Sequence, residues 1–285
     1  MAQSRPRFQA PPVVETVLSV QFSNLPGYST AHAGWFWKEY LEKLGGRSSL
    51  TWSQAVDAPP LEDQFERFGA EDVWGPQFAM KFLAPTQSAR TQIIRSDGER
   101  MVQVQDSRLV LNWQKKSGEY PNFEPLVQEF RTLLHAFETF AAEASFRALQ
   151  YNQWEIAYVD QFKKGDMWES ASDWNKILPG LVVPPVLVSH LLSTGDERIS
   201  ADWRFSLANQ RGRMYIQLRQ LRIAPSNEEV LNVTWVARGP VTAPETWEQG
   251  FALGHDAITA AVVAAADDGH HGTDTGNSMA DLQRR

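Results

Sequence analysis

The chain has 285 residues, a formal net charge of −7 and a hydrophobic fraction of 42%. Its 11 Trp and 15 Phe are typical of a packed interior, and its length is enough for one large core or two of common size. It contains no Cys, which excludes disulfides and cysteine-bearing metal sites and favours a cytoplasmic location. The acidic charge disfavours nucleic acid as a partner, and no apolar stretch approaches the roughly 18 residues of a membrane span.

The first part of the chain predicts a strand, a helix and a β-meander. Residues 1–12 form a Pro-rich lead that we expect to be flexible, and the alternation over residues 13–22 predicts a strand. A short aromatic helix is expected to follow and to stop at Gly45. Residues 47–76 are expected to be mostly loop, with a weak strand near residues 50–52. The meander is predicted from four alternating segments, at residues 78–82, 91–95, 101–105 and 109–113.

A long amphipathic helix is predicted after the meander. Asn122 is expected to cap it, and apolar residues recur at spacings of three and four from Leu126 to Phe140. This spacing places the apolar residues on one face, so we expect the helix to lie across the meander.

The order of elements then begins again. A strand is predicted over residues 154–162 and a short helix over 173–178. Thr242 and Glu245 have the spacing of a capping box that opens a last helix, and residues 265–285 form a polar tail that we expect to be disordered. The second meander is predicted from three strands, at residues 201–207, 214–221 and 230–236.

This repeated order predicts an α+β fold of two related halves, residues 13–148 and 149–264. Each half would contain a strand, a crossover, an antiparallel β-meander and a long packing helix. Residues 15–22 (ETVLSVQF) resemble residues 155–162 (EIAYVDQF), which favours an internal duplication with a pseudo-twofold axis.

Two residues are candidates for acid–base chemistry, although no catalytic, phosphate-binding or metal-binding motif occurs and no cofactor or metal is expected. His255 interrupts the last helix beside its apolar side. Asp160 takes the place of Val20 in the aligned halves, on an inward face where a carboxylate needs a partner or a shifted pKa. For His255 a structural role is favoured over catalysis. For Asp160 an ion pair with Arg204 or Arg219, or a reversed strand register that turns the carboxylate outward, is favoured over catalysis.

Aromatic and arginine side chains predict a binding surface. Trp35 and Trp37 on the first helix, Tyr158 on the central strand, and Arg204 and Arg219 on the later strands are of the residue types that anchor interfaces. Core packing explains the same aromatic residues equally well. Base stacking would need a basic stripe beside them, which the sequence does not provide.

Three segments are similar to a sporadically distributed bacterial protein family of about this length that has no established activity. They are PPVVETVLSVQF (residues 11–22), LQYNQWEIAYVDQF (residues 149–162) and LGHDAI (residues 253–258). In that family the central strand carries a Tyr followed by a polar residue, similar to Tyr158 and Asp160, and the last helix carries a His, similar to His255. The patchy distribution of the family implies a phage-defence or toxin-linked setting.

We therefore predict a non-catalytic binding or regulatory protein that recognises a protein partner or a small ligand. Two alternatives remain open. One is an enzyme that uses His255 and Asp160 in a cleft between the halves, and the other is nucleic-acid binding on a saddle-shaped sheet.

Overall fold

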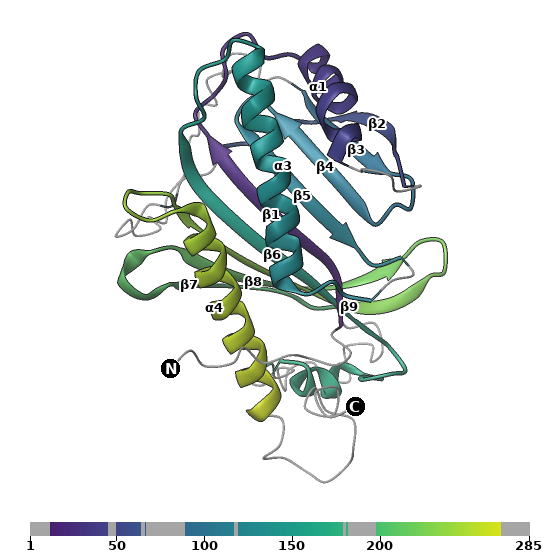
Figure 1. Ribbon diagram of the computed structural model, residues 1–285. Coiled ribbons are helices and arrows are strands. Elements are labelled where there is room, and N and C mark those ends of the chain that lie inside the picture. The colour runs from purple at the N-terminus through teal and green to yellow at the C-terminus, as the bar shows by residue number, and fades with distance from the viewer. Residues whose placement is uncertain are drawn as a thin grey trace, which may run out of the picture.

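The computed structural model describes residues 12–44, 50–63, 66, 89–116, 119–178, 181 and 198–268. Its central feature is one antiparallel sheet of nine strands in the order β2-β3-β4-β5-β1-β6-β9-β8-β7 (Figure 1). The strands are β1 (Val13–Phe22), β2 (Trp52–Ala58), β3 (Arg90–Arg95), β4 (Arg100–Gln105), β5 (Arg108–Gln114), β6 (Tyr151–Lys163), β7 (Ser200–Ser206), β8 (Arg213–Ile223) and β9 (Glu228–Pro240).

The prediction of two related halves is wrong. The strands expected to be equivalent, β1 and β6, pair with each other at the centre of the sheet, with Leu18 opposite Ile156. Their buried side chains belong to one continuous apolar cluster, so no boundary separates two cores. By this pairing the backbone N–H and C=O groups of β1 and β6 form hydrogen bonds with each other. The two strands therefore belong to one sheet.

The described connections also differ between the two parts. Between β1 and β2 the chain forms α1 (Thr30–Phe36), a π-helical turn (Trp37–Leu41) and α2 (Glu42–Leu44). After β6 the described part of the connection contains only the 3₁₀ turn η2 (Ala171–Lys176), and a second 3₁₀ turn, η4 (Ala208–Gln210), follows β7. The described parts of the two crossovers are therefore not copies of one another.

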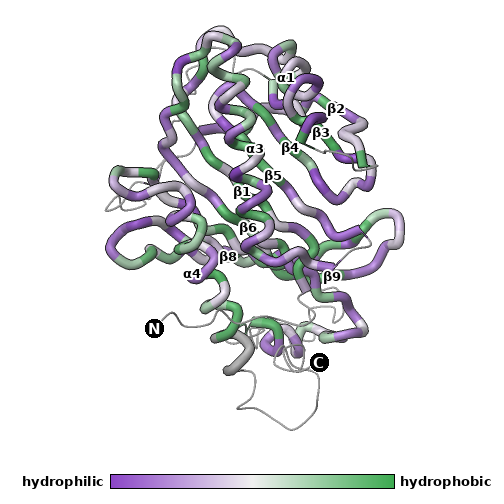
Figure 2. The backbone as a smooth tube through the Cα atoms, in the orientation of Figure 1, coloured by the Kyte–Doolittle hydropathy of each residue, from purple (hydrophilic) through white to green (hydrophobic). Residues whose placement is uncertain are grey.

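Helices cover one face of the sheet. The helix α3 (Phe123–Glu143) lies over β1 and β5, and α4 (Trp247–Asp268) packs on β6 and β9 (Figure 1). The rings of Phe22 and Phe137 lie 5.7 Å apart, which joins β1 to α3. Hydrophobic and hydrophilic residues alternate along the strands in Figure 2, as expected where only one face is packed against helices.

Glycines bring α4 close to the sheet. A Cβ atom on Gly250 would lie 2.3 Å from the Trp154 ring, and one on Gly254 would lie 2.5 Å from Ile156 Cγ2. The helix can approach β6 this closely only because these two positions have no side chain.

Local details correct the predicted helix starts. Asn122 precedes α3 but has φ 66° and makes no capping hydrogen bond through its side chain. The capping box of α4 is formed by Thr246 and Gln249, with Gln249 Oε1 accepting from Thr246 N at 2.9 Å, rather than by Thr242 and Glu245. The helix also continues to residue 268, four residues into the range predicted as a tail.

The remaining expectations divide into three groups: confirmed, corrected and outside the described residues. Strands were predicted correctly at residues 13–22, 91–95, 101–105 and 109–113. Gly98 makes the hairpin turn between β3 and β4 with φ 70°. The predicted loop at residues 47–76 contains the strand β2. The strand predicted at residues 78–82, the lead up to residue 11 and the tail from residue 269 lie outside the described residues.

Candidate functional site

The sheet face opposite α3 and α4 is lined with polar side chains, and we call it the polar face. Because strand side chains alternate, it carries the residues between those that meet the helices. Ser19, Gln21, Arg108 and Gln153 on this face are each less than 5% exposed. The polar residues of the face include Glu15, Ser19 and Gln21 on β1, Gln103 and Gln105 on β4, Arg108 and Asn112 on β5, Gln153 and Glu155 on β6, Arg204 on β7, Arg213 and Tyr215 on β8, and Arg238 on β9.

Hydrogen bonds between side chains tie neighbouring strands together across this face. Gln103 Nε2 donates to Asn112 Oδ1 at 2.6 Å, and Asn112 Nδ2 donates to Glu15 Oε1 at 2.7 Å. Arg108 Nη2 donates to Gln21 Oε1 at 2.6 Å. Such a network holds polar groups at fixed positions without a helix above them.

Four residues that follow β2 are bound on the polar face, and we call them the acidic segment: Leu61, Glu62, Asp63 and Glu66. The side chain of Gln105 accepts from Leu61 N and donates to Leu61 O, both at 2.8 Å. Arg108 Nη2 donates to Glu62 O at 3.3 Å. Asp63 Oδ1 accepts from the hydroxyl of Ser107, in the β4–β5 turn, at 2.8 Å.

Glu66 occupies a site made by three donors from β8 and β9. Tyr215 OH donates to its two carboxylate oxygens at 2.8 and 2.9 Å, Arg213 Nε lies 3.1 Å away, and Arg238 Nε forms a short ion pair with it. The Glu66 side chain is 5% exposed. A buried carboxylate is stable only with such charged donors, so these three side chains form a carboxylate-binding site.

The electrostatics of this site favour a bound anion. Burial lowers the pKa of Arg238, but its hydrogen bonds with Glu66 and Tyr215 outweigh this effect and raise the pKa above its usual value. Burial raises the pKa of Tyr215; the Arg238 contact opposes this effect and Glu66 adds to it. The Tyr215 hydroxyl therefore keeps the proton that it donates. The guanidinium carbon of Arg204 lies 5.7 Å from the centre of the Tyr215 ring and that of Arg238 lies 4.5 Å away, within cation–π range.

One guanidinium on this face is incompletely satisfied. Arg108 is 4% exposed, and its Nε has no hydrogen-bond partner. Burial lowers its pKa, whereas the nearby carboxylates of Glu155 and Asp63 act in the opposite direction. The hydroxyl oxygen of Ser19, on the neighbouring strand, is also buried without a partner.

The predicted catalytic candidates lie on the helix-covered side. His255 Nδ1 on α4 forms a hydrogen bond with Tyr158 OH at 2.8 Å. The His255 ring stacks on Phe123, with ring centroids 4.1 Å apart. Asp160 is 2% exposed and accepts from Trp235 Nε1 at 2.8 Å. The structure therefore pairs His255 with Tyr158, and Asp160 with Trp235.

Asp160 is a buried carboxyl group without a cationic partner among its hydrogen bonds. Its Oδ1 has no hydrogen-bond partner, and burial raises its pKa to about 7. Arg219, one expected partner, instead pairs with Asp202 at 2.9 Å, and Arg204 lies against Tyr215 on the polar face. The sequence correctly identified an unusual carboxyl group, but the expected ion pair does not form.

Of the two predicted tryptophans, Trp35 lies in α1 and Trp37 begins the π-helical turn that follows it. Trp35 is 38% exposed and contacts Phe140 edge to face, with ring centroids 5.4 Å apart. Trp37 Nε1 donates to Trp52 O at 3.0 Å, and Lys38 Nζ lies 4.0 Å above the Trp37 ring. Both side chains fasten α1 to its neighbours, and neither lies on the polar face.

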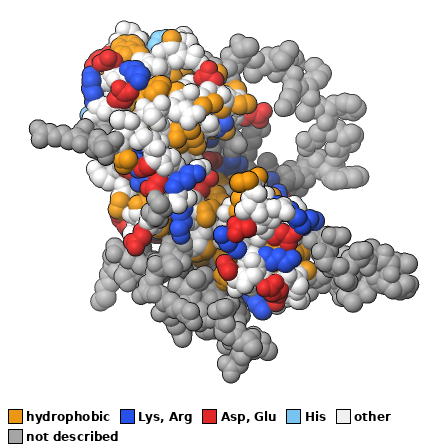
Figure 3. Space-filling model, turned by 90° about the vertical axis from the view of Figure 1, so that its right-hand side faces the viewer, with side chains coloured by type: hydrophobic (Ala, Val, Ile, Leu, Met, Phe, Trp, Pro, Cys, Tyr) orange, Lys and Arg blue, Asp and Glu red, His pale blue; other side chains and the backbone are white. Residues whose placement is uncertain are grey.

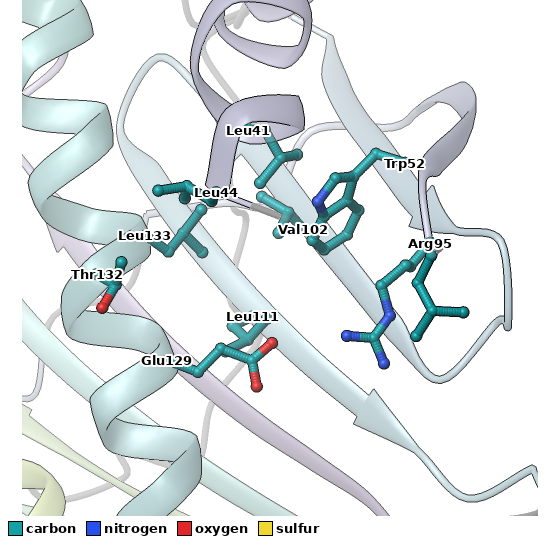
Figure 4. Close-up of a pocket in the computed structure, with 10 residues that line it drawn as sticks. Leu41, Leu44, Trp52, Arg95, Val102, Leu111, Glu129, Thr132 and Leu133 are labelled. Carbon is teal, nitrogen blue, oxygen red and sulfur yellow. The ribbon is translucent and has the colours of Figure 1, made fainter. Parts of the chain in front are cut away.

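A cavity of about 320 Å³ opens between α2, α3 and the β2–β4 end of the sheet (Figure 4). In Figure 4 Leu41, Val102 and Trp52 form one wall, and the charged ends of Arg95 and Glu129 lie together on another side. Arg95 is held by Asp97 at 2.7 Å, and Glu129 is held by Arg100 at 2.9 Å. The charges at the cavity are thus already paired, and the lining available to a ligand is mainly apolar.

Sequence reasoning did not identify the carboxylate-binding site. Arg213, Tyr215 and Arg219 alternate along β8, which is a readable signal of a polar stripe on one face of a strand. Glu66 gave no such signal, because it is separated from Tyr215 by 149 positions and from Arg238 by 172.

Within the described residues no group of three or more metal-binding side chains occurs, and no helix is long and apolar enough to cross a membrane. In comparisons with known proteins, no family model and no curated protein matches the chain. The family resemblance of the three sequence segments therefore remains a prediction.

Proposed function

We propose that this chain is a binding protein that recognises a carboxylate-bearing segment of a protein partner on its polar face. The observation that carries the proposal is the Glu66 site, in which Tyr215, Arg213 and Arg238 hold one carboxylate in a nearly buried position. Fixed arginine donors bind carboxylates with directional hydrogen bonds, which gives specificity as well as attraction.

The charge distribution favours a protein over a nucleic acid. Basic and acidic side chains are interleaved on the flank shown in Figure 3, without a continuous basic stripe. Arg219 is already paired with Asp202, and the net charge of −7 repels a phosphate backbone. A few arginines aimed at one point suit a single carboxylate better than a polyanion.

A screen of random linear peptides tests this proposal. The purified protein is expected to select peptides rich in Asp and Glu, and Arg238→Gln is expected to weaken their binding about tenfold, because a charged donor is lost. Arg198→Gln removes an exposed arginine that pairs with Glu229, away from Glu66, and serves as the charge-matched control. The proposal would be contradicted if the selected peptides were not enriched in acidic residues, or if the Arg238→Gln variant bound them as tightly as the natural chain does.

The cavity beside α2 favours a second candidate function, the binding of a small apolar ligand. Its volume of about 320 Å³ lies at the lower end of the range of ligand pockets. An apolar fluorescent dye is expected to bind there. The Leu44→Glu variant is expected to bind the dye more weakly, since Leu44 lines the cavity and is 41% exposed. Unchanged dye binding by that variant would rule out the cavity as the site.

A further inference from the structure

We infer that the acidic segment is an internal competitor for the partner's binding site, and that the partner's segment is a linear peptide with two carboxylates three residues apart. This inference rests on the proposed function. It adds the chemistry of the ligand and a means of regulation to the recognition of a carboxylate.

The first argument is that the acidic segment is bound at two separate places on the polar face. Asp63 and Leu61 are bound at β4 and at the β4–β5 turn, whereas Glu66 is bound by β8 and β9. The strands β5, β1, β6 and β9 are successive neighbours, so β1 and β6 lie between the places where Asp63 and Glu66 are bound. Three residues span at most about 10 Å, so long side chains such as those of Glu66 and Arg238 are needed to reach both places at once.

The second argument is that side chains, rather than strand pairing, hold the segment. Gln105 binds both backbone groups of Leu61, as it would bind any residue of a peptide. Ser107 and the Arg213, Tyr215 and Arg238 site bind carboxylates. Nothing in these contacts requires the peptide to be part of the same chain.

The third argument is that the acidic segment is an imperfect ligand. It leaves Arg108 Nε and Ser19 Oγ buried without hydrogen-bond partners, although Arg108 Nη2 reaches the Glu62 carbonyl. An external peptide with an acceptor at this point satisfies a donor that the internal segment does not. Such a peptide has an energetic reason to replace the acidic segment.

The consequence is regulation by competition. A tethered segment acts at a high effective concentration, on the order of millimolar for a short connection, and lowers the apparent affinity of any external peptide. The polar face is then available to a partner only when the partner's segment binds better than the internal one.

A binding experiment with a defined probe tests this inference. The probe is a fluorescent peptide of residues 59–66, PPLEDQFE, and the protein carries Asp63→Asn and Glu66→Gln together, which weakens the internal segment without changing side-chain size. We expect this released variant to bind the probe at least tenfold more tightly than the natural chain does. Glu39→Gln is the control, since the Glu39 side chain is 57% exposed on the π-helical turn far from the polar face.

Two further measurements test whether the gain in affinity depends on the carboxylates of the probe and on Arg238. A probe with Asn in place of Asp63 and Gln in place of Glu66 is expected to bind the released variant no more tightly than the natural chain. The released variant with Arg238→Gln added is likewise expected to lose its tenfold gain in affinity for the acidic probe. Equal affinity of the natural chain and the released variant would overturn the competition, and the peptide screen with Arg238→Gln would still decide the proposed function. Failure of the probe to bind the released variant would overturn the inferred ligand chemistry.

Discussion

The two faces of the sheet each bury a carboxyl group, and they do so in opposite ways. On the helix-covered face Asp160 has one indole donor and no cation, and burial raises its pKa to about 7. On the polar face Glu66 is almost as deeply buried, but two arginines and a tyrosine surround it. The difference teaches that burial alone does not define a site: the cationic donors around Glu66 make a receptor for an anion, whereas the surroundings of Asp160 favour its protonated form.

The largest expected effect is the loss of a cation from the polar face. Arg238→Met removes a donor from Glu66 and leaves a buried charge less well compensated, so we expect the free energy of unfolding at pH 7 to fall by about 3–5 kcal/mol. Chemical denaturation measures this loss. Adding Glu66→Gln is expected to restore a large part of it, because the charge that needs the arginine is gone; additive losses would contradict the pairing.

The next effect distinguishes the two carboxyl groups by pH. Asp160 has a pKa of about 7 in the folded protein and about 3.9 when unfolded, so between these values the folded state holds more protons. The unfolding free energy therefore falls as pH rises and becomes level above about pH 7. From pH 5 to pH 8 we expect the natural chain to lose roughly 2–3 kcal/mol relative to Asp160→Asn, which cannot titrate.

Unfolding curves of both proteins at several pH values measure this difference. Asp202→Asn, which changes an acid whose side chain is 55% exposed, is the control and is expected to follow the natural chain. If the Asp160→Asn protein shows the same dependence as the natural chain, Asp160 is not the titrating group.

A smaller effect is expected from the close contact between α4 and the helix-covered face. Gly250→Ala places a Cβ atom 2.3 Å from the Trp154 ring and is expected to lower the unfolding free energy by about 1–3 kcal/mol. Gly34→Ala in α1 meets no atom within 4 Å and is expected to stabilise by up to about 1 kcal/mol through helix propensity. Equal effects of the two substitutions would mean that α4 does not lie this close to β6.

The smallest effect is expected at Arg219, which the sequence singled out as a binding residue. Its ion pair with Asp202 is partly exposed, so Arg219→Gln is expected to change the unfolding free energy by less than about 1 kcal/mol. Binding of acidic peptides is expected to stay unchanged, since the guanidinium is already occupied. A tenfold loss of peptide affinity in this variant would extend the binding site along β8.

Much of the local structure followed from the sequence. Apolar residues at alternate positions identified β1 and β6, and spacings of three and four identified α3. Asp160 stood out because a carboxylate occupies an otherwise apolar side of β6. The signal was chemical and local, so it was readable without the fold.

The candidate site was mostly unreadable for the opposite reason. Glu66 comes from a segment predicted as loop, and the two arginines that bind it lie on strands β8 and β9 near the other end of the chain. Trp35 and Trp37 looked like binding residues because exposed and buried aromatic residues share one sequence signature. Their packing at α1 became visible only with the neighbouring elements in place.

The sequence by itself determined the periodicity of the chain, and thus which segments become strands and helices and which of their sides are apolar. Only the tertiary structure decided that β1 pairs with β6, which makes one sheet of what looked like two halves, and that Glu66 meets Arg213 and Arg238. Periodicity is a property of neighbours along the chain. Pairing over more than a hundred residues depends instead on the closure of long loops and on competition among many polar partners, neither of which leaves a local pattern.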